Sequence, residues 1–304
     1  MVSPLQTTDY LPAPGEARQA GKLQTIPFVF FGTPPLVIPI LDELKNNGFM
    51  PSLVVTAPDR PAGRGLKLVS PPAKIWAEKN KIPVLQPEKI DNEFISKLKT
   101  KNLELFIVVA YGKIFPQEII DLPKFGTFNI HYSLLPKYRG ATPVESAILN
   151  GEKETGVSIQ KMAFELDSGP VVSEEKTPIG ENETAPELRE RLNDIGKKLL
   201  VETIPKIISG TAKETKQEDT QATFTKKIKK EDGLIDPKGN AEENFRKYRA
   251  YFGWPGVYFF AERKGKKVRV IIKNAELKNG AFKINRVLPE GKKEIDYKNF
   301  LYAG

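Results

Sequence analysis

Short, wholly apolar runs alternate with segments of helical spacing over much of this 304-residue chain, and this alternation restricts the fold more than any other feature. The apolar runs cover 28–31, 53–55, 84–85 and 105–110, a further strand is predicted over 128–131, and helices are predicted over 36–47, 72–81 and 92–101. A run without polar positions is typical of a strand buried on both faces. The pattern therefore predicts an α/β fold, a mostly parallel sheet with helices on both faces and right-handed crossovers. Ligands of such sheets bind beyond the carboxyl ends of the strands.

The pattern changes after a long amphipathic helix predicted over 186–209. Residues 211–222 are polar and lack apolar periodicity, which indicates a linker. Strand-like segments at 257–260, 268–272 and 281–287 follow, separated by turns rich in Lys and Gly, and they predict a small β domain. We therefore divide the chain into a flexible extension (1–24), an α/β domain (25–210), a linker (211–223) and a basic β domain (224–304).

Positive charge is concentrated in the last part of the chain. Residues 224–304 contain 20 Lys and Arg but 10 Asp and Glu, whereas the rest of the chain is close to neutral. This asymmetry favours a module that binds a polyanion. A lysine-rich surface that serves only solubility would give the same charge, and charge alone does not separate the two interpretations.

The near absence of two residue types excludes several kinds of chemistry. The chain has no Cys and one His, His131. Disulfide frameworks, thiol nucleophiles, Cys-based metal sites and His-rich metal clusters are therefore excluded. A general base must be His131, a carboxylate or a Lys.

Export and membrane signals are missing from the sequence pattern. The first residues lack a basic start followed by an apolar core, and the longest uncharged stretch, 26–41, is short and broken by prolines. We expect a cytoplasmic protein that is monomeric and does not bind membranes.

The only histidine lies two residues after Asn129, at the end of a predicted strand, so both side chains leave the same face of the sheet. An imidazole can accept a proton from an attacking nucleophile, and an amide N–H can stabilise a developing oxyanion, which together suit acyl or formyl transfer. Asp167, in a Leu-Asp-Ser-Gly turn, is a candidate carboxylate to orient the imidazole. A structural histidine and a simple Asx-turn remain the alternatives.

The two segments together are more specific. Asn129-x-His131-x-Ser-Leu-Leu-Pro-x-x-Arg-Gly, followed by Gly-Val-Ser-Ile and Leu-Asp167-x-Gly, resembles the folate-dependent formyltransferases. The resemblance implies transfer of a formyl group from 10-formyltetrahydrofolate to an amine, without metal or covalent enzyme intermediate. It implies that His131 is the general base, Asn129 stabilises the oxyanion and Asp167 orients the imidazole.

The same resemblance implies a folate site and a Rossmann-like first domain. The folate contacts would come from Ser133, Leu134, Leu135 and Pro136, and from the strand-end loop with Ala110, Tyr111, Gly112 and Ile114. Tyr132 departs from the family, which usually has Gly or Ala there, and we expect it to crowd the turn into Ser133.

Two further features concern the formyl acceptor. The loop with Arg60, Arg64 and Lys67 resembles an insertion loop in one branch of the family, which formylates methionyl initiator tRNA for translation initiation. The basic end of the chain resembles the OB-like β-barrel of the same branch. The resemblance implies that this loop and Lys226, Lys227 and Lys229 contact tRNA. We expect Trp254 to be a core aromatic.

Two alternatives to a formyltransferase that acts on tRNA remain. One is a formyltransferase for nucleotide-linked amino sugars, and the other is a non-catalytic RNA-binding protein.

Overall fold

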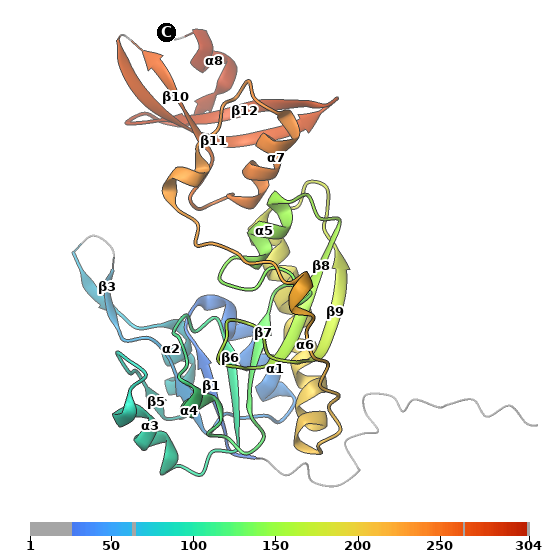
Figure 1. The fold of residues 1–304 in the computed structure, drawn as a ribbon. Helices are drawn as coiled ribbons and strands as arrows, with labels where there is room; N and C mark the ends of the chain where they lie inside the picture. The colour runs from blue at the N-terminus through green and yellow to red at the C-terminus, as the bar shows by residue number, and fades with distance from the viewer. Residues whose placement is uncertain (1–25, 63–64, 264, 303–304) are drawn as a thin grey trace, which may run out of the picture.

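The computed structural model describes residues 26–62, 65–263 and 265–302. The larger unit contains a seven-stranded sheet in the order β5-β2-β1-β6-β7-β8-β9 (Figure 1). Strands β5, β2, β1, β6 and β7 are parallel, and β8 is antiparallel to β7 and β9. The predicted mostly parallel sheet is confirmed. Its strands are β1 (Phe28–Gly32), β2 (Leu53–Val55), β5 (Val84–Leu85), β6 (Leu105–Val109), β7 (Thr127–His131), β8 (Glu154–Lys161) and β9 (Val171–Pro178).

Helices cover both faces of this sheet because its central strands are apolar on both sides. In β1, Phe28 and Phe30 pack toward one layer of helices, while Val29 and Phe31 pack toward the other. The first layer contains α1 (Ile38–Asn46), α2 (Pro72–Lys79) and α6 (Ala185–Ile208), and the second contains α3 (Asn92–Lys99) and α4 (Gln117–Ile120). A short 3₁₀ turn (Pro35–Val37) precedes α1.

The loop predicted to carry Arg60, Arg64 and Lys67 contains a short antiparallel hairpin, β3 (Arg60–Ala62) paired with β4 (Lys67–Val69). Its Gly and Pro content obscured this pairing in the sequence. The hairpin stands away from the main sheet (Figure 1). Its base is held by Asp59, whose carboxylate accepts hydrogen bonds of 2.7 Å from both Lys74 and Gln86. These donors, Lys74 first, lower the pKa of Asp59.

The smaller unit is a four-stranded antiparallel sheet, which confirms the predicted β domain. Its elements are β10 (Tyr258–Arg263), β11 (Lys266–Lys278), β12 (Ala281–Pro289), β13 (Ile295–Asp296), α7 (Ala241–Ala250) and α8 (Tyr297–Tyr302). In the part of the chain that the structure describes, this sheet is open rather than a closed barrel, with β10 and β13 at its edges. Helices α7 and α8 pack against this sheet.

The two units are in direct contact. Helix α5 (Pro143–Leu149) of the first unit packs against α7 of the second (Figure 1). Arg249 of α7 donates a 3.0 Å hydrogen bond to the carbonyl oxygen of Gly180. Helices α5 and α7 had no counterpart in the sequence prediction. Among the described residues, no helix is both long enough and apolar enough to cross a lipid bilayer.

Candidate active site

Alternation along β7 and β8 creates a polar patch at one edge of the apolar sheet. Phe128 and Ile130 point into the core beneath α6, so Asn129 and His131 share the opposite face. On the neighbouring strand, Gln160 pairs with Asn129 and Ser158 pairs with His131, which places these two polar side chains on the same face. The patch lies at the carboxyl end of β7, where α/β sheets bind ligands.

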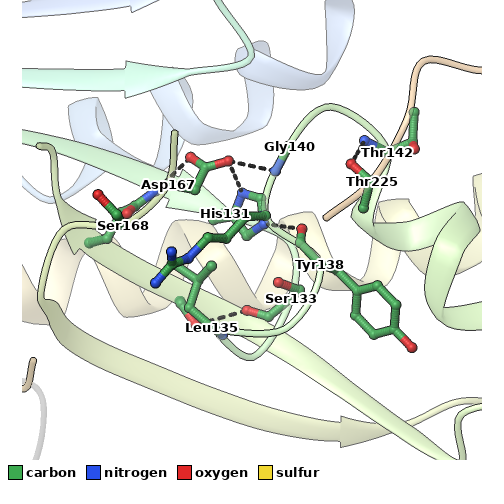
Figure 2. A network of polar contacts seen from close by, with 12 residues as sticks. His131, Ser133, Leu135, Tyr138, Gly140, Thr142, Asp167, Ser168 and Thr225 are labelled. Carbon is green, nitrogen blue, oxygen red and sulfur yellow. Dashed lines mark hydrogen bonds and ion pairs between the residues drawn. The ribbon is translucent and has the colours of Figure 1, made fainter. Parts of the chain in front are cut away.

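The His131 ring is held by hydrogen bonding at one nitrogen and faces a carboxylate with the other. Nε2 lies 2.9 Å from the carbonyl oxygen of Tyr138, and Nδ1 lies 3.7 Å from Oδ2 of Asp167 (Figure 2). A carbonyl oxygen can only accept a hydrogen bond, so Nε2 carries the proton in the neutral ring. The basic lone pair is therefore on Nδ1. The residue is only 5% exposed.

Asp167 is fixed by two donors besides its proximity to His131. Its Oδ2 accepts the backbone N–H of Gly140 at 2.8 Å, and its Oδ1 accepts the side-chain amide of Gln160 at 2.7 Å. Its backbone φ of 48° is in the left-handed region, as the predicted tight turn requires. The structure thus brings the predicted His131 and Asp167 together. Asn129 is on the same strand face as His131, with Cβ atoms about 7 Å apart by strand geometry.

The segment 133–136 forms a turn that is stabilised by hydrogen bonds to Lys137 and to Ser158 of β8. The Ser133 hydroxyl donates to the carbonyl oxygen of Lys137 at 2.6 Å, and the Ser158 hydroxyl donates to the carbonyl oxygen of Ser133 at 2.8 Å. The side chains of Ser133 and Leu135 are buried, whereas Leu134 and Pro136 are half-buried. Of the four predicted folate contacts, only Leu134 and Pro136 retain exposed side-chain surface.

The loop after β6 presents mainly backbone at the carboxyl edge of the sheet. Ala110 and Gly112 are exposed, with φ of 46° and 76°, and Ile114 is 87% exposed. Tyr111 is buried against Phe31, and burial raises the pKa of its hydroxyl, which has no hydrogen-bond partner among the described residues. The exposed backbone of Ala110 and Gly112 is therefore available to a ligand, whereas the Tyr111 hydroxyl is buried in the core.

Tyr132 does not crowd the turn, contrary to our expectation. It follows His131 on the strand and therefore points to the other face of the sheet, where its hydroxyl donates to Oδ1 of Asn193 at 2.7 Å. The ring packs near Gly196 of α6, the position at which a helix residue without a side chain leaves space. The bulky residue is thus accommodated beneath α6, away from the polar patch.

The predicted tRNA contacts occupy two separate places. Arg60 and Lys67 are exposed on the β3–β4 hairpin, whereas Arg64 lies outside the described residues, as does the extension predicted over 1–24. Lys226, Lys227 and Lys229 are exposed where the chain leaves the first unit. Trp254 is 58% exposed, so our prediction of a core aromatic was wrong. It lies in the turn before β10 and not on an inward-facing strand position.

Sequence reasoning assigned no role to three side chains around the site, although Arg139 is part of the motif quoted above. Gln160 donates to Asp167, and Gln217 and Arg139 are hydrogen-bonded to each other beneath the Asp167 turn. The strand alternation in β8 could have identified Gln160. Gln217 gave no signal, because it lies in the polar segment that was predicted as a linker.

Comparison with known proteins shows which family this chain belongs to. A sequence model described as "Formyl transferase" matches residues 25–204, and one described as "Formyl transferase, C-terminal domain" matches residues 227–282. The chain belongs to the formyl transferase family. The family resemblance drawn from the Asn129–His131 and Asp167 segments is thereby confirmed.

Individual relatives agree with this membership. A methionyl-tRNA formyltransferase of Thermodesulfovibrio yellowstonii is 40% identical over 291 residues, 90% of this chain and 94% of the relative. The same-named protein of Citrifermentans bemidjiense is 42% identical over 241 residues, 79% of this chain and 76% of the relative. An N-formyltransferase of Helicobacter canadensis, solved with folinic acid and dTDP-3-aminofucose, shares the fold with a TM-score of 0.61 at 22% identity, covering 83% of this chain and 89% of that structure.

Proposed function

We propose that this formyl transferase moves the formyl group of 10-formyltetrahydrofolate to the α-amino group of methionyl initiator tRNA, producing N-formylmethionyl-tRNA. The observation that carries the proposal is the placement of His131, with its free Nδ1 facing Asp167, on the strand face it shares with Asn129. The curated relatives at 40% identity and above that are named methionyl-tRNA formyltransferase support the choice of acceptor.

The reaction requires a base, an oxyanion donor and a fixed geometry. The folate donor supplies the formyl carbon, and the residues around the 110–114 loop and the 133–136 turn hold it. His131 accepts the proton of the attacking amine at Nδ1 as the amine nitrogen bonds to the formyl carbon, and the resulting imidazolium lies beside the Asp167 carboxylate. The bond between the formyl carbon and N10 of the folate then breaks, and the same proton passes from His131 to N10 of the leaving tetrahydrofolate. The Asn129 amide donates an N–H to the formyl oxygen as this oxygen gains negative charge.

The acceptor is a large polyanion, and the charge distribution suits it. Residues 224–304 carry a net excess of ten positive charges, and Arg60 and Lys67 add positive charge on the projecting hairpin. Neutralising phosphates with such side chains provides affinity that does not depend on sequence. We assign 25–210 to catalysis, 211–223 to the connection between the domains and 224–304 to tRNA binding, and we propose that a monomer in the cytoplasm is the active form.

The test is a formylation assay with the purified protein, 10-formyltetrahydrofolate and initiator tRNA charged with methionine. We expect formylmethionine to form, and a protein that forms none refutes the proposal. His131→Ala should still bind tRNA and lose turnover by about 10²–10⁴-fold, the usual contribution of a general base. Adding a nucleotide-linked amino sugar as a competing acceptor tests the alternative substrate: efficient formylation of the sugar in preference to tRNA would favour it.

A further inference from the structure

The segment predicted as a linker is packed against the candidate active site. Residues 215–225, which we term the strap, cross the two loops that surround His131. At one end, Thr215 and Val171 exchange backbone hydrogen bonds of 2.8 and 2.9 Å. At the other, Arg139 and Phe224 form a parallel bridge. The strap then continues into the smaller unit with the four-stranded sheet, which we term the tail domain.

One strap side chain is buried at the centre of this contact. Gln217 is only 7% exposed, and its Nε2 donates to the carbonyl oxygens of Asp167 at 2.8 Å and of Gly169 at 2.6 Å. Its Oε1 accepts from Nε and Nη2 of Arg139 at 3.0 and 2.8 Å. One amide therefore uses both donor hydrogens and its oxygen to connect the Asp167 turn to Arg139.

Arg139 lies between the two backbone groups that position the pair. The carbonyl oxygen of Tyr138, the residue before it, accepts from His131, and the N–H of Gly140, the residue after it, donates to Asp167. The strap also pairs with the Arg139 backbone. The N–H of Arg139 donates to the carbonyl oxygen of Thr223, and the carbonyl oxygen of Arg139 accepts from the N–H of Thr225, each at 2.8 Å. Gln217 thus bonds the loop of Asp167 to the loop that orients His131.

The Asp167 turn needs such support. Residues other than glycine seldom adopt the left-handed conformation, and even aspartate, which adopts it more readily than most, is stabilised there by contacts that hold the turn. The carbonyl oxygen of Asp167 is held by Gln217, and its carboxylate by Gly140 and Gln160. Without the Gln217 donors, the turn has fewer contacts that oppose its relaxation.

We propose that Gln217 is a positioning residue for the proposed formyl transfer: it holds Asp167 in register with His131 and makes the connection to the tail domain part of the active site. The inference rests on the proposed function. It also explains how a segment with no apolar residue pattern can be ordered, because its buried polar atoms are hydrogen-bonded to the loops of the site.

The sharpest variant is Gln217→Glu. The glutamate keeps the shape and retains an acceptor for Arg139, but it replaces the NH₂ group, and with it both N–H donors, by one oxygen that faces two carbonyl oxygens. We expect kcat to fall by about 10–100-fold, as small displacements of catalytic groups do, while the KM values for tRNA and folate stay within about twofold. Gln221→Glu is the matched control, because Gln221 is exposed on the same strap and its side chain bonds only Glu218 within the strap. It should leave kcat unchanged.

A spectroscopic signal separates positioning from loss of structure. His131 is the only histidine, so in protein without a histidine tag its ring ¹⁵N signals are unique. They should move in Gln217→Glu, in the same direction as in Asp167→Asn, and stay in place in Gln221→Glu. If Gln217→Glu does not fold, Gln217→Met removes the same donors and carries the same expectations.

Wild-type kcat in the Gln217 variant, or a lower kcat with unmoved His131 signals, would overturn the inference. A rise in KM alone would do so too. Failure of the wild-type protein to formylate methionyl-tRNA refutes the proposed function instead, and the ring signals still report whether Gln217 positions the His131–Asp167 pair.

Discussion

Oδ2 of Asp167 lies 3.7 Å from Nδ1 of His131, beyond direct hydrogen-bond distance, while the same oxygen accepts the N–H of Gly140 at 2.8 Å. The carboxylate is therefore held by the protein and not by the imidazole. The ring is instead oriented from its other side, by the carbonyl oxygen of Tyr138. This division leaves the Nδ1 lone pair available for a proton, next to a negative charge that is already in place.

Asp167→Asn should lower kcat by about 10²-fold, within the range for general acid–base groups, with little change in KM. The amide lacks the negative charge beside Nδ1, and its NH₂ would face either the Gly140 N–H or the Gln160 amide, which are both donors. Steady-state formylation kinetics measure the effect, with Asp121→Asn at an exposed aspartate as control. An Asp167→Asn enzyme with wild-type kcat would remove Asp167 from the mechanism.

Asn129→Ala should lower kcat by about 10²–10³-fold, the usual effect of removing an oxyanion donor. Because the side chain is only half-buried, stability should change little, and thermal unfolding of the same preparation provides the control. Equal losses in kcat and in kcat/KM are expected, since the interaction forms only in the transition state. A rise in KM with kcat unchanged would show instead that Asn129 only binds substrate.

Charge reversal on the hairpin should weaken the use of tRNA and not the chemistry. Arg60→Glu and Lys67→Glu change exposed residues of β3 and β4, so we expect kcat/KM for tRNA to fall, the KM for folate to stay constant, and the salt dependence of tRNA binding to become shallower. Lys79→Glu, at an exposed position at the end of α2, makes the same charge change away from the hairpin. Equal effects at Lys79 and at the hairpin would indicate only a loss of overall charge.

Tyr132→Phe should destabilise the fold by about 1–2 kcal/mol. The change removes the hydroxyl that donates to Asn193 and leaves the amide oxygen without this donor under α6. Denaturant unfolding measures the difference, with Tyr302→Phe at an exposed position as control. Because Tyr132 points away from His131, kcat should remain within about twofold of wild type; a large kcat effect would mean that the two faces of the sheet are coupled.

The stabilising effect of Tyr138 should depend on pH. Its hydroxyl donates to Glu152 at 2.7 Å and, together with Lys137, lowers the pKa of Glu152 below its ordinary value of 4.5. A depressed carboxyl pKa contributes stability that is complete above the unfolded value and is lost as the pH falls through the folded one. Tyr138→Phe should therefore destabilise the protein more at pH 7 than at pH 3.5 in denaturant unfolding. An equal destabilisation at both values would contradict this linkage.

Local patterns predicted the elements whose residues carry their own signal. Buried parallel strands such as Phe28–Gly32 are apolar at every position, and the helix Ala185–Ile208 repeats its apolar residues and has a Pro at its start. The β3–β4 hairpin and the open form of the tail sheet were missed, since both depend on which segments pair and not on the residues within one segment.

The sequence by itself determined the α/β class, the chemistry available to a chain with one histidine and no cysteine, and the shared face of Asn129 and His131, because each follows from composition or from the two-residue period of a strand. Only the tertiary structure decided which nitrogen of His131 is free, where Tyr132 points and that Gln217 is buried beneath Asp167. Each of these three facts depends on a hydrogen bond formed by the folded chain. The bond of Gln217 with Asp167 joins residues 50 positions apart, and the bond of Tyr132 with Asn193 joins residues 61 positions apart. Polar side chains form such bonds wherever the folded chain brings partners together, and a polar segment gives no periodic signal of that contact in advance.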